Sequence, residues 1–126
     1  MGQESSSKSR KAFVVEQQGE LAVVIPQVDL RELNYEWIEQ GAREVLELLD
    51  ASQIKHVIVD FHNTDYYGST ALGFFLKVFK RARSRGGQMV FCNVSEHEKE
   101  ILQITGLNHL WPICATREAA LTAINK

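Results

Sequence analysis

Apolar residues along the chain gather in short runs that alternate with segments of helical periodicity. The runs 12–17 and 21–26 are rich in β-branched residues and are separated by a short segment containing glycine, which predicts a β-hairpin. Because Pro26 has no N–H to donate, the second strand should end there or lie at an edge of the sheet. Residues 34–51 then show the spacing of an amphipathic helix. Its apolar positions are Trp37, Ile38, Val45, Leu48 and Leu49.

Strands and helices continue to alternate in the second half of the chain. Runs 56–61 and 88–94 are almost continuously apolar, as expected for central strands that are covered on both faces. A helix is predicted over about 69–85 between them, and two successive glycines should end it. A short strand is predicted at 110–113. The expected buried face of the 69–85 helix is Leu72, Phe75, Leu76 and Phe79.

Capping signals mark the last two helices. Ser95 and Glu98 have the spacing of a capping box, and Gly106 should end that helix. Thr116 is the expected cap of a final helix. The positions expected to face inward in the helix after Ser95 are Ile101, Leu102 and Ile104. The pattern as a whole predicts an α/β fold, with a mixed sheet that begins in a hairpin, is otherwise mainly parallel, and is covered by about four helices.

Composition narrows the class of protein. With 126 residues and 44% hydrophobic residues, we expect one globular domain over 12–126, after a polar tail at 1–11 that should be disordered. No apolar run approaches the ~20 residues of a membrane helix, and a net charge of −2 does not favour nucleic-acid binding. The two cysteines, Cys92 and Cys114, should be buried free thiols of a cytoplasmic protein. No metal or other cofactor is expected.

Candidate chemistry lies between the 56–61 strand and the helix that follows it. Ser69 and Thr70 open this helix, where unpaired backbone amides and the helix dipole favour a negative group such as a phosphate. Physical chemistry alone favours a structural role for Ser69 as the cap of this helix, and that role does not conflict with a regulatory one. A small hydrolase or nucleotide-binding enzyme that uses Asp60, His62 and Ser69, with Asp65 nearby, is the catalytic alternative, although no nucleophile-elbow or P-loop motif is present.

Several motifs in order resemble the STAS domain of bacterial anti-sigma-factor antagonists, over residues 12–124. The family's Asp-Ser-Ser/Thr-Gly-Leu-Gly signature matches Gly-Ser-Thr-Ala-Leu-Gly at 68–73. Downstream, Asn-Val-Ser at 93–95 and Thr-Gly-Leu at 105–107 also match family positions. Asp29 falls where the family has the Asp of an upstream loop.

The resemblance implies a regulatory switch and not an enzyme. The unphosphorylated form would bind an anti-sigma factor that is also a serine kinase. Phosphorylation of Ser69, or of Thr70 as second choice, would release it, and a PP2C-type phosphatase would reset the switch. A weak homodimer is a further option, and no nucleic acid or membrane is expected as a partner. The binding face would comprise Asp29, Asp65, Tyr66, Tyr67, Gly68, Ser69, Thr70 and Leu72.

Two positions depart from the family signature. Gly68 stands where the family has Asp, and Ala71 stands where it has Gly. Asp65 could replace the missing acidic neighbour in part. The alternative is therefore a STAS scaffold or binding module that is not phosphorylated, of the stressosome-like or transporter-associated kind.

Overall fold

The computed structural model describes residues 12–27, 35–63 and 69–125, with the side chains of residues 35, 69, 70 and 125 left out. The strands within these ranges are β1 (Phe13–Gln18), β2 (Leu21–Pro26), β3 (His56–Asp60), β4 (Met89–Cys92) and β5 (Ile113–Cys114). The helices are α2 (Tyr35–Ala51), α3 (Ser69–Ser84), α4 (Glu96–Thr105) and α5 (Arg117–Asn125), with a short 3₁₀ helix at Leu107–His109. None of the helices in the described ranges is long and apolar enough to cross a membrane.

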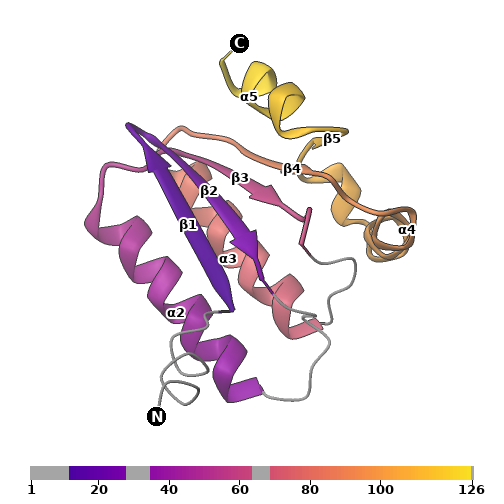
Figure 1. Cartoon of the computed structure of the whole chain (residues 1–126), viewed down its shortest axis with the longest axis horizontal. Coiled ribbons are helices and arrows are strands. Elements are labelled where there is room, and N and C mark those ends of the chain that lie inside the picture. The colour runs from indigo at the N-terminus through magenta and orange to yellow at the C-terminus, as the bar shows by residue number, and fades with distance from the viewer. Residues whose placement is uncertain (1–11, 28–34, 64–68, 126) are drawn as a thin grey trace.

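The strands form one mixed sheet in the order β1-β2-β3-β4-β5 (Figure 1). β1 and β2 form the predicted antiparallel hairpin, in which Phe13 lies opposite Pro26, the last residue of β2. All the other neighbouring strands are parallel. The predicted α/β class and the mixed sheet are therefore confirmed. The parallel strands end at the same edge of the sheet, and this edge leads into the loops that precede the helices.

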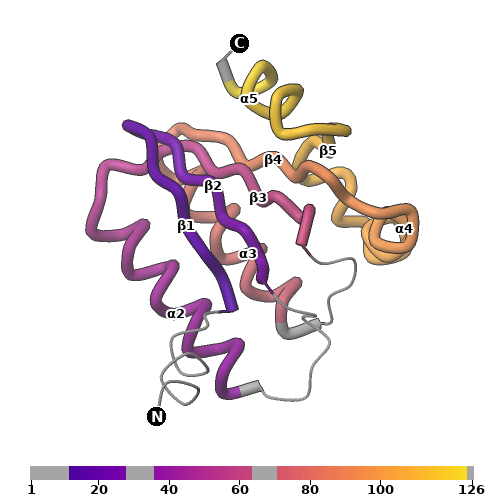
Figure 2. The backbone as a smooth tube through the Cα atoms, viewed as in Figure 1, coloured from indigo at the N-terminus to yellow at the C-terminus, as the bar shows by residue number. Residues whose placement is uncertain are grey.

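Helices cover both faces of the sheet, as the backbone trace in Figure 2 shows. Alternate strand residues contribute to two separate hydrophobic cores, because successive side chains point to opposite faces. Val57 and Val59 of β3 pack with α2, α3 and α4, whereas Ile58 packs with α5. Burial on both faces explains why the central strands are continuously apolar.

The buried face of α3 differs from the sequence prediction. Only Phe75 of the expected set is fully buried, while Leu72, Leu76 and Phe79 are half-buried at the margin of the core. The fully buried positions are Ala71, Phe74, Phe75, Val78 and Ala82. Nearly every position from 71 to 79 is apolar, so periodicity alone could not orient this helix.

The segment after α4 also departs from prediction. Ile104 was expected to face inward but is 83% exposed, and Trp111 fills the core instead, with its ring 4.8 Å from Phe91. The short strand predicted at 110–113 is a two-residue strand that begins at Ile113, and a 3₁₀ helix precedes it. Cys114 is half-buried and was expected to be buried, whereas Cys92 is buried; both are free thiols.

The predicted helix boundaries are well supported by local geometry. Ser95 and Glu98 form both hydrogen bonds of the capping box, and the hydroxyl of Thr116 accepts the N–H of Ala119 at 3.1 Å. Gly87 follows α3 where a Cβ atom would lie 1.7 Å from the carbonyl oxygen of Lys55. Glycine is therefore required there by the close approach of two backbone segments.

The candidate functional site at the start of helix α3

The candidate site lies where β3 ends and α3 begins (Figure 1). Phe61 follows β3 and is buried, with its ring 5.5 Å from Phe75 on α3 and 5.0 Å from Phe91 on β4. The rings of Phe75 and Phe91 are themselves 5.3 Å apart. These three aromatic residues fix the first half of α3 against the end of the central strands, because fully buried rings in contact leave little freedom to shift.

Asp60 is the polar centre of this edge of the sheet. Its carboxylate is only 2% exposed and accepts hydrogen bonds from three other residues. Oδ1 accepts the Asn93 side-chain amide at 2.9 Å and the His62 backbone N–H at 3.0 Å, and it lies 3.0 Å from His62 Nδ1. Oδ2 accepts Nε of Arg117 at 2.9 Å. One carboxylate thus connects the end of β3, the start of the following loop, the end of β4 and the start of α5.

Arg117 extends this connection to the hairpin. Its Nη1 donates to Oε1 of Glu16 on β1 at 2.9 Å. Burial alone would raise the pKa of Asp60, but the hydrogen bonds from Asn93, Arg117 and His62 hold it below its usual value. Burial alone would lower the pKa of Arg117, but the bonds to Asp60 and Glu16 raise it. Asp60 and Arg117 are therefore a charged, fully paired structural unit at neutral pH.

Sequence reasoning missed the partners of Asp60. Arg117 lies 57 residues away along the chain, and Asn93 lies 33 residues away. One signal was present: Arg117 is the first residue of α5, and a cation is unfavourable at the positive end of a helix dipole. A basic residue in that place indicates a specific acidic partner.

α3 offers a positively polarised tip at its first residue. The helix has 16 residues, begins at Ser69 and has no acidic residue in its first turn. Arg81 and Arg83 lie in its last turn and complement the negative end of the dipole. The unpaired first-turn amides therefore favour a negative group near Ser69 over a positive one.

The predicted site residues are only partly placed. Ser69 and Thr70 are the first two residues of α3, and their side chains lie outside the described part of the structure. Leu72 is half-buried and packs against the core. The predicted site residues that lie outside the described ranges are Asp29, Asp65, Tyr66, Tyr67 and Gly68.

The hydrolase alternative has limited geometric support. Asp60 and His62 of the hydrolase alternative are in contact, but the same carboxylate also binds Arg117 and Asn93 and so joins four elements of the fold. Among the described residues, no group of three or more His, Cys, Asp or Glu side chains could hold a metal ion.

A family model for the STAS domain matches residues 13–120. The chain belongs to the STAS domain family. BtrV of Bordetella bronchiseptica, a candidate anti-sigma factor antagonist, is 32% identical over 85 residues, which is 68% of this chain and 72% of BtrV. This STAS protein is thus related in sequence to proteins of the anti-sigma factor antagonist group.

Solved structures agree with this assignment. An anti-sigma-factor antagonist (STAS) domain protein from Planctomyces limnophilus has a TM-score of 0.78 at 26% identity, over 90% of this chain and 98% of that one. The unphosphorylated form of the anti-sigma factor antagonist SpoIIAA has a TM-score of 0.77 at 21% identity, over 90% and 96% of the two chains. The phosphorylated form of SpoIIAA, a Bacillus cell fate determinant, has a TM-score of 0.70, over 90% and 99%.

Proposed function

We propose that this STAS protein is an anti-sigma factor antagonist that is switched by phosphorylation of Ser69. In its unphosphorylated form it binds an anti-sigma factor that is also a serine kinase, and so frees the sigma factor. The kinase transfers the γ-phosphoryl group of ATP to the Ser69 hydroxyl, whose proton leaves, and ADP is released. The phosphorylated protein dissociates, and a PP2C-type phosphatase hydrolyses the phosphate ester and restores the binding form.

The observation that carries the proposal is the position of Ser69 as the first residue of α3. A phosphate at this position is stabilised by the helix dipole and by first-turn amides, so the modification does not require the fold to open. Two further facts support the proposal: the named relatives include anti-sigma factor antagonists, and SpoIIAA has a phosphorylated form. The departure from the family signature at Ala71 concerns a fully buried side chain, which lies in the first turn of α3 but packs in the core.

The contacts of Asp60 and Phe61 fix the end of β3, from which the chain leads to Ser69. Asp60 holds the backbone N–H of His62, the first residue of the loop that leads toward Ser69. Phe61 and Phe75 hold the two ends of the same connection against the sheet. A new charge at Ser69 is therefore expected to act on the partner and not on the protein's own core.

Electrostatics explains how a single phosphate could end binding. Phosphorylation adds nearly two negative charges, which must lose their hydration when a partner covers the helix tip. If the partner offers no matching arginine, a loss of about 100-fold in affinity corresponds to about 2.8 kcal/mol, which is well within the cost of burying an unpaired charge.

The test is a phosphorylation assay with an anti-sigma factor kinase encoded in the same genome. With ATP and magnesium, mass spectrometry should find one phosphate on Ser69 in the wild-type protein and none in Ser69→Ala. Thr70→Ala is the matched control, because it removes the neighbouring hydroxyl, and it should still be phosphorylated at Ser69. Phosphate on Thr70 alone would show that Thr70, and not Ser69, is the phosphoacceptor.

The same assay also tests the alternative of a STAS binding module that is not phosphorylated. Gly68 stands where the family has an acidic residue beside the phosphoacceptor. If the kinase binds the protein but transfers no phosphate to either residue, the protein is a STAS binding module without a phosphorylation switch, as in a stressosome-like assembly or beside a transporter.

A further inference from the structure

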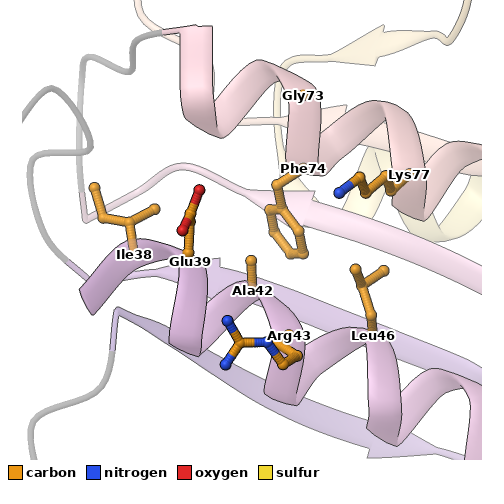
Figure 3. A pocket seen from close by; sticks show the side chains of 8 residues that line it. All are labelled: Ile38, Glu39, Ala42, Arg43, Leu46, Gly73, Phe74 and Lys77. Carbon is orange, nitrogen blue, oxygen red and sulfur yellow. The ribbon is translucent and has the colours of Figure 1, made fainter. Parts of the chain in front are cut away.

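A groove runs between α2 and α3, and its lining on α3 begins at Gly73, about one turn after the start of that helix. It has a volume of about 510 Å³ and is lined by residues of both helices. Figure 3 shows the Phe74 ring pointing from α3 toward Ala42 on α2, with Leu46 beyond one side of it and Ile38 and Glu39 beyond the other. The floor is apolar, because Ile38, Ala42 and Phe74 are buried.

Gly73 on this groove has no role that the fold itself explains. A Cβ atom added there would meet nothing within 4 Å, and glycine is among the least favourable residues inside a helix. Gly41 of α2 is different, since a Cβ atom there would lie 3.2 Å from the Cβ of Ala12 and 3.3 Å from the Phe13 ring. Packing therefore explains Gly41, whereas Gly73 leaves space for something outside the described fold.

Gly73 also connects the groove to the candidate site. It follows Ser69 by four residues, about one helical turn, so the two backbone positions lie on the same side of α3. Lys77 follows one turn later and also lines the groove. A partner that covers the α3 tip can therefore continue along the groove without changing direction.

The charges at the rim indicate the chemistry of the occupant. Arg43 on α2 and Lys77 on α3 are exposed, and neither forms an ion pair with another residue in the described part of the chain. The cations near the other end of α3 are paired, because Arg81 on α3 and Arg85 just after it both bind Asp50 near the end of α2. The groove thus combines an apolar floor with one available cation on each helix and a single anion, Glu39.

From these observations we infer that the groove receives a segment of the anti-sigma factor, with an apolar side chain over Phe74 and a carboxylate between Arg43 and Lys77. Gly73 allows the backbone of this segment to approach α3 closely, and the two cations select an acidic segment over a basic one. The inference rests on the proposed function, because its occupant is the partner of that switch.

The test measures binding of the purified anti-sigma factor kinase, by calorimetry without ATP. Gly73→Leu should fill the groove and raise the Kd more than about tenfold, and Arg43→Glu and Lys77→Glu should each raise it about tenfold. Lys80→Glu is the matched control: it changes the same charge on the same helix, outside the groove lining, and should stay within about threefold of wild type.

Gly73→Ala keeps the test independent of misfolding. Because the site is open and helical, this variant should melt about 3 °C higher than wild type while binding the kinase more weakly. A more stable protein with weaker binding cannot be explained by loss of structure. If Gly73→Ala, Gly73→Leu and Lys77→Glu all bind like wild type, the inference is wrong.

The remaining outcomes separate the two proposals. If wild type binds and Ser69→Glu does not, but the groove variants bind normally, the switch stands and the groove has no part in it. If wild type binds no anti-sigma factor of its genome, the proposed function fails and the groove loses its assigned occupant. If sedimentation velocity shows a dimer that Gly73→Leu dissociates, the occupant is a second copy of this chain, which overturns the inference.

Discussion

Replacement of Asp60 tests whether the carboxylate at the end of β3 holds four parts of the fold together. In Asp60→Ala, the side-chain amide of Asn93, the backbone N–H of His62 and Nε of Arg117 all lose their acceptor. Removing one partner of a buried charge pair costs about 3–5 kcal/mol. With a urea slope of about 1.5 kcal/mol/M, the unfolding midpoint should fall by about 2–3 M.

The matched control is Asp50→Ala. Asp50 accepts Nε of Arg81 at 2.8 Å, nearly the same geometry as the 2.9 Å bond between Asp60 and Arg117. The Asp50 side chain is 52% exposed, however, so water replaces the lost bond and the midpoint should hardly move. Equal, small effects of the two substitutions would refute the claim that Asp60 is a structural centre.

The pH dependence of the free energy of unfolding tests whether the Asp60 carboxylate stabilises the fold in its charged form. The folded-state pKa of Asp60 lies below its usual value, so its stabilisation is complete above the unfolded pKa of about 3.9 and is lost as pH falls through the folded value. Asp60→Asn should be less stable than wild type by about 2 kcal/mol at pH 7. Its neutral amide has only one acceptor oxygen, so it cannot accept both from Arg117 and from Asn93 and His62, which bond to different oxygens of Asp60. This difference should shrink below about pH 4; a difference that grows in acid would contradict the assignment.

Three further predictions concern packing and reactivity. Phe75→Ala should lower the free energy of unfolding by about 4 kcal/mol and Leu76→Ala by clearly less, because only Phe75 is fully buried; equal losses in urea titrations would contradict the observed face of α3. Gly87→Ala should melt well below wild type, since its Cβ would collide with the backbone of Lys55; an unchanged melting temperature would refute that contact. The Cys92 thiol, whose pKa burial raises to about 12, should react with iodoacetamide at pH 8 only after unfolding; mass spectrometry of the alkylated native protein checks this.

Local patterns were sufficient to predict the order of strands and helices. The hairpin, the central strands and the capped helices depend on neighbours within a few residues, such as the Ser95 and Glu98 pair. Orientation was harder to predict where a helix is apolar on most sides, so Phe74 and Val78 of α3 were missed. Ile104 was placed inward by spacing but is exposed, whereas Trp111, seven residues later, is buried in the core.

In the candidate site too, features set by neighbouring residues could be predicted from the sequence, whereas features set by distant residues could not. The motif around Ser69 is contiguous, so the sequence alone placed it at the start of a helix. The connection from Asp60 to Arg117 and Glu16 joins three segments that are far apart along the chain, and only the sheet brings them together. The groove could not be predicted either, since it depends on how α2 and α3 lie against each other.

The most direct test compares two forms of the same chain in binding to the anti-sigma factor kinase. Protein carrying one phosphate on Ser69 is separated from unmodified protein, and the Kd of each is measured by calorimetry without ATP. We expect a Kd at least about 100-fold higher for the phosphorylated form, with a melting temperature no lower than that of the unmodified protein. Equal affinities for the two forms would show that Ser69 is not a switch.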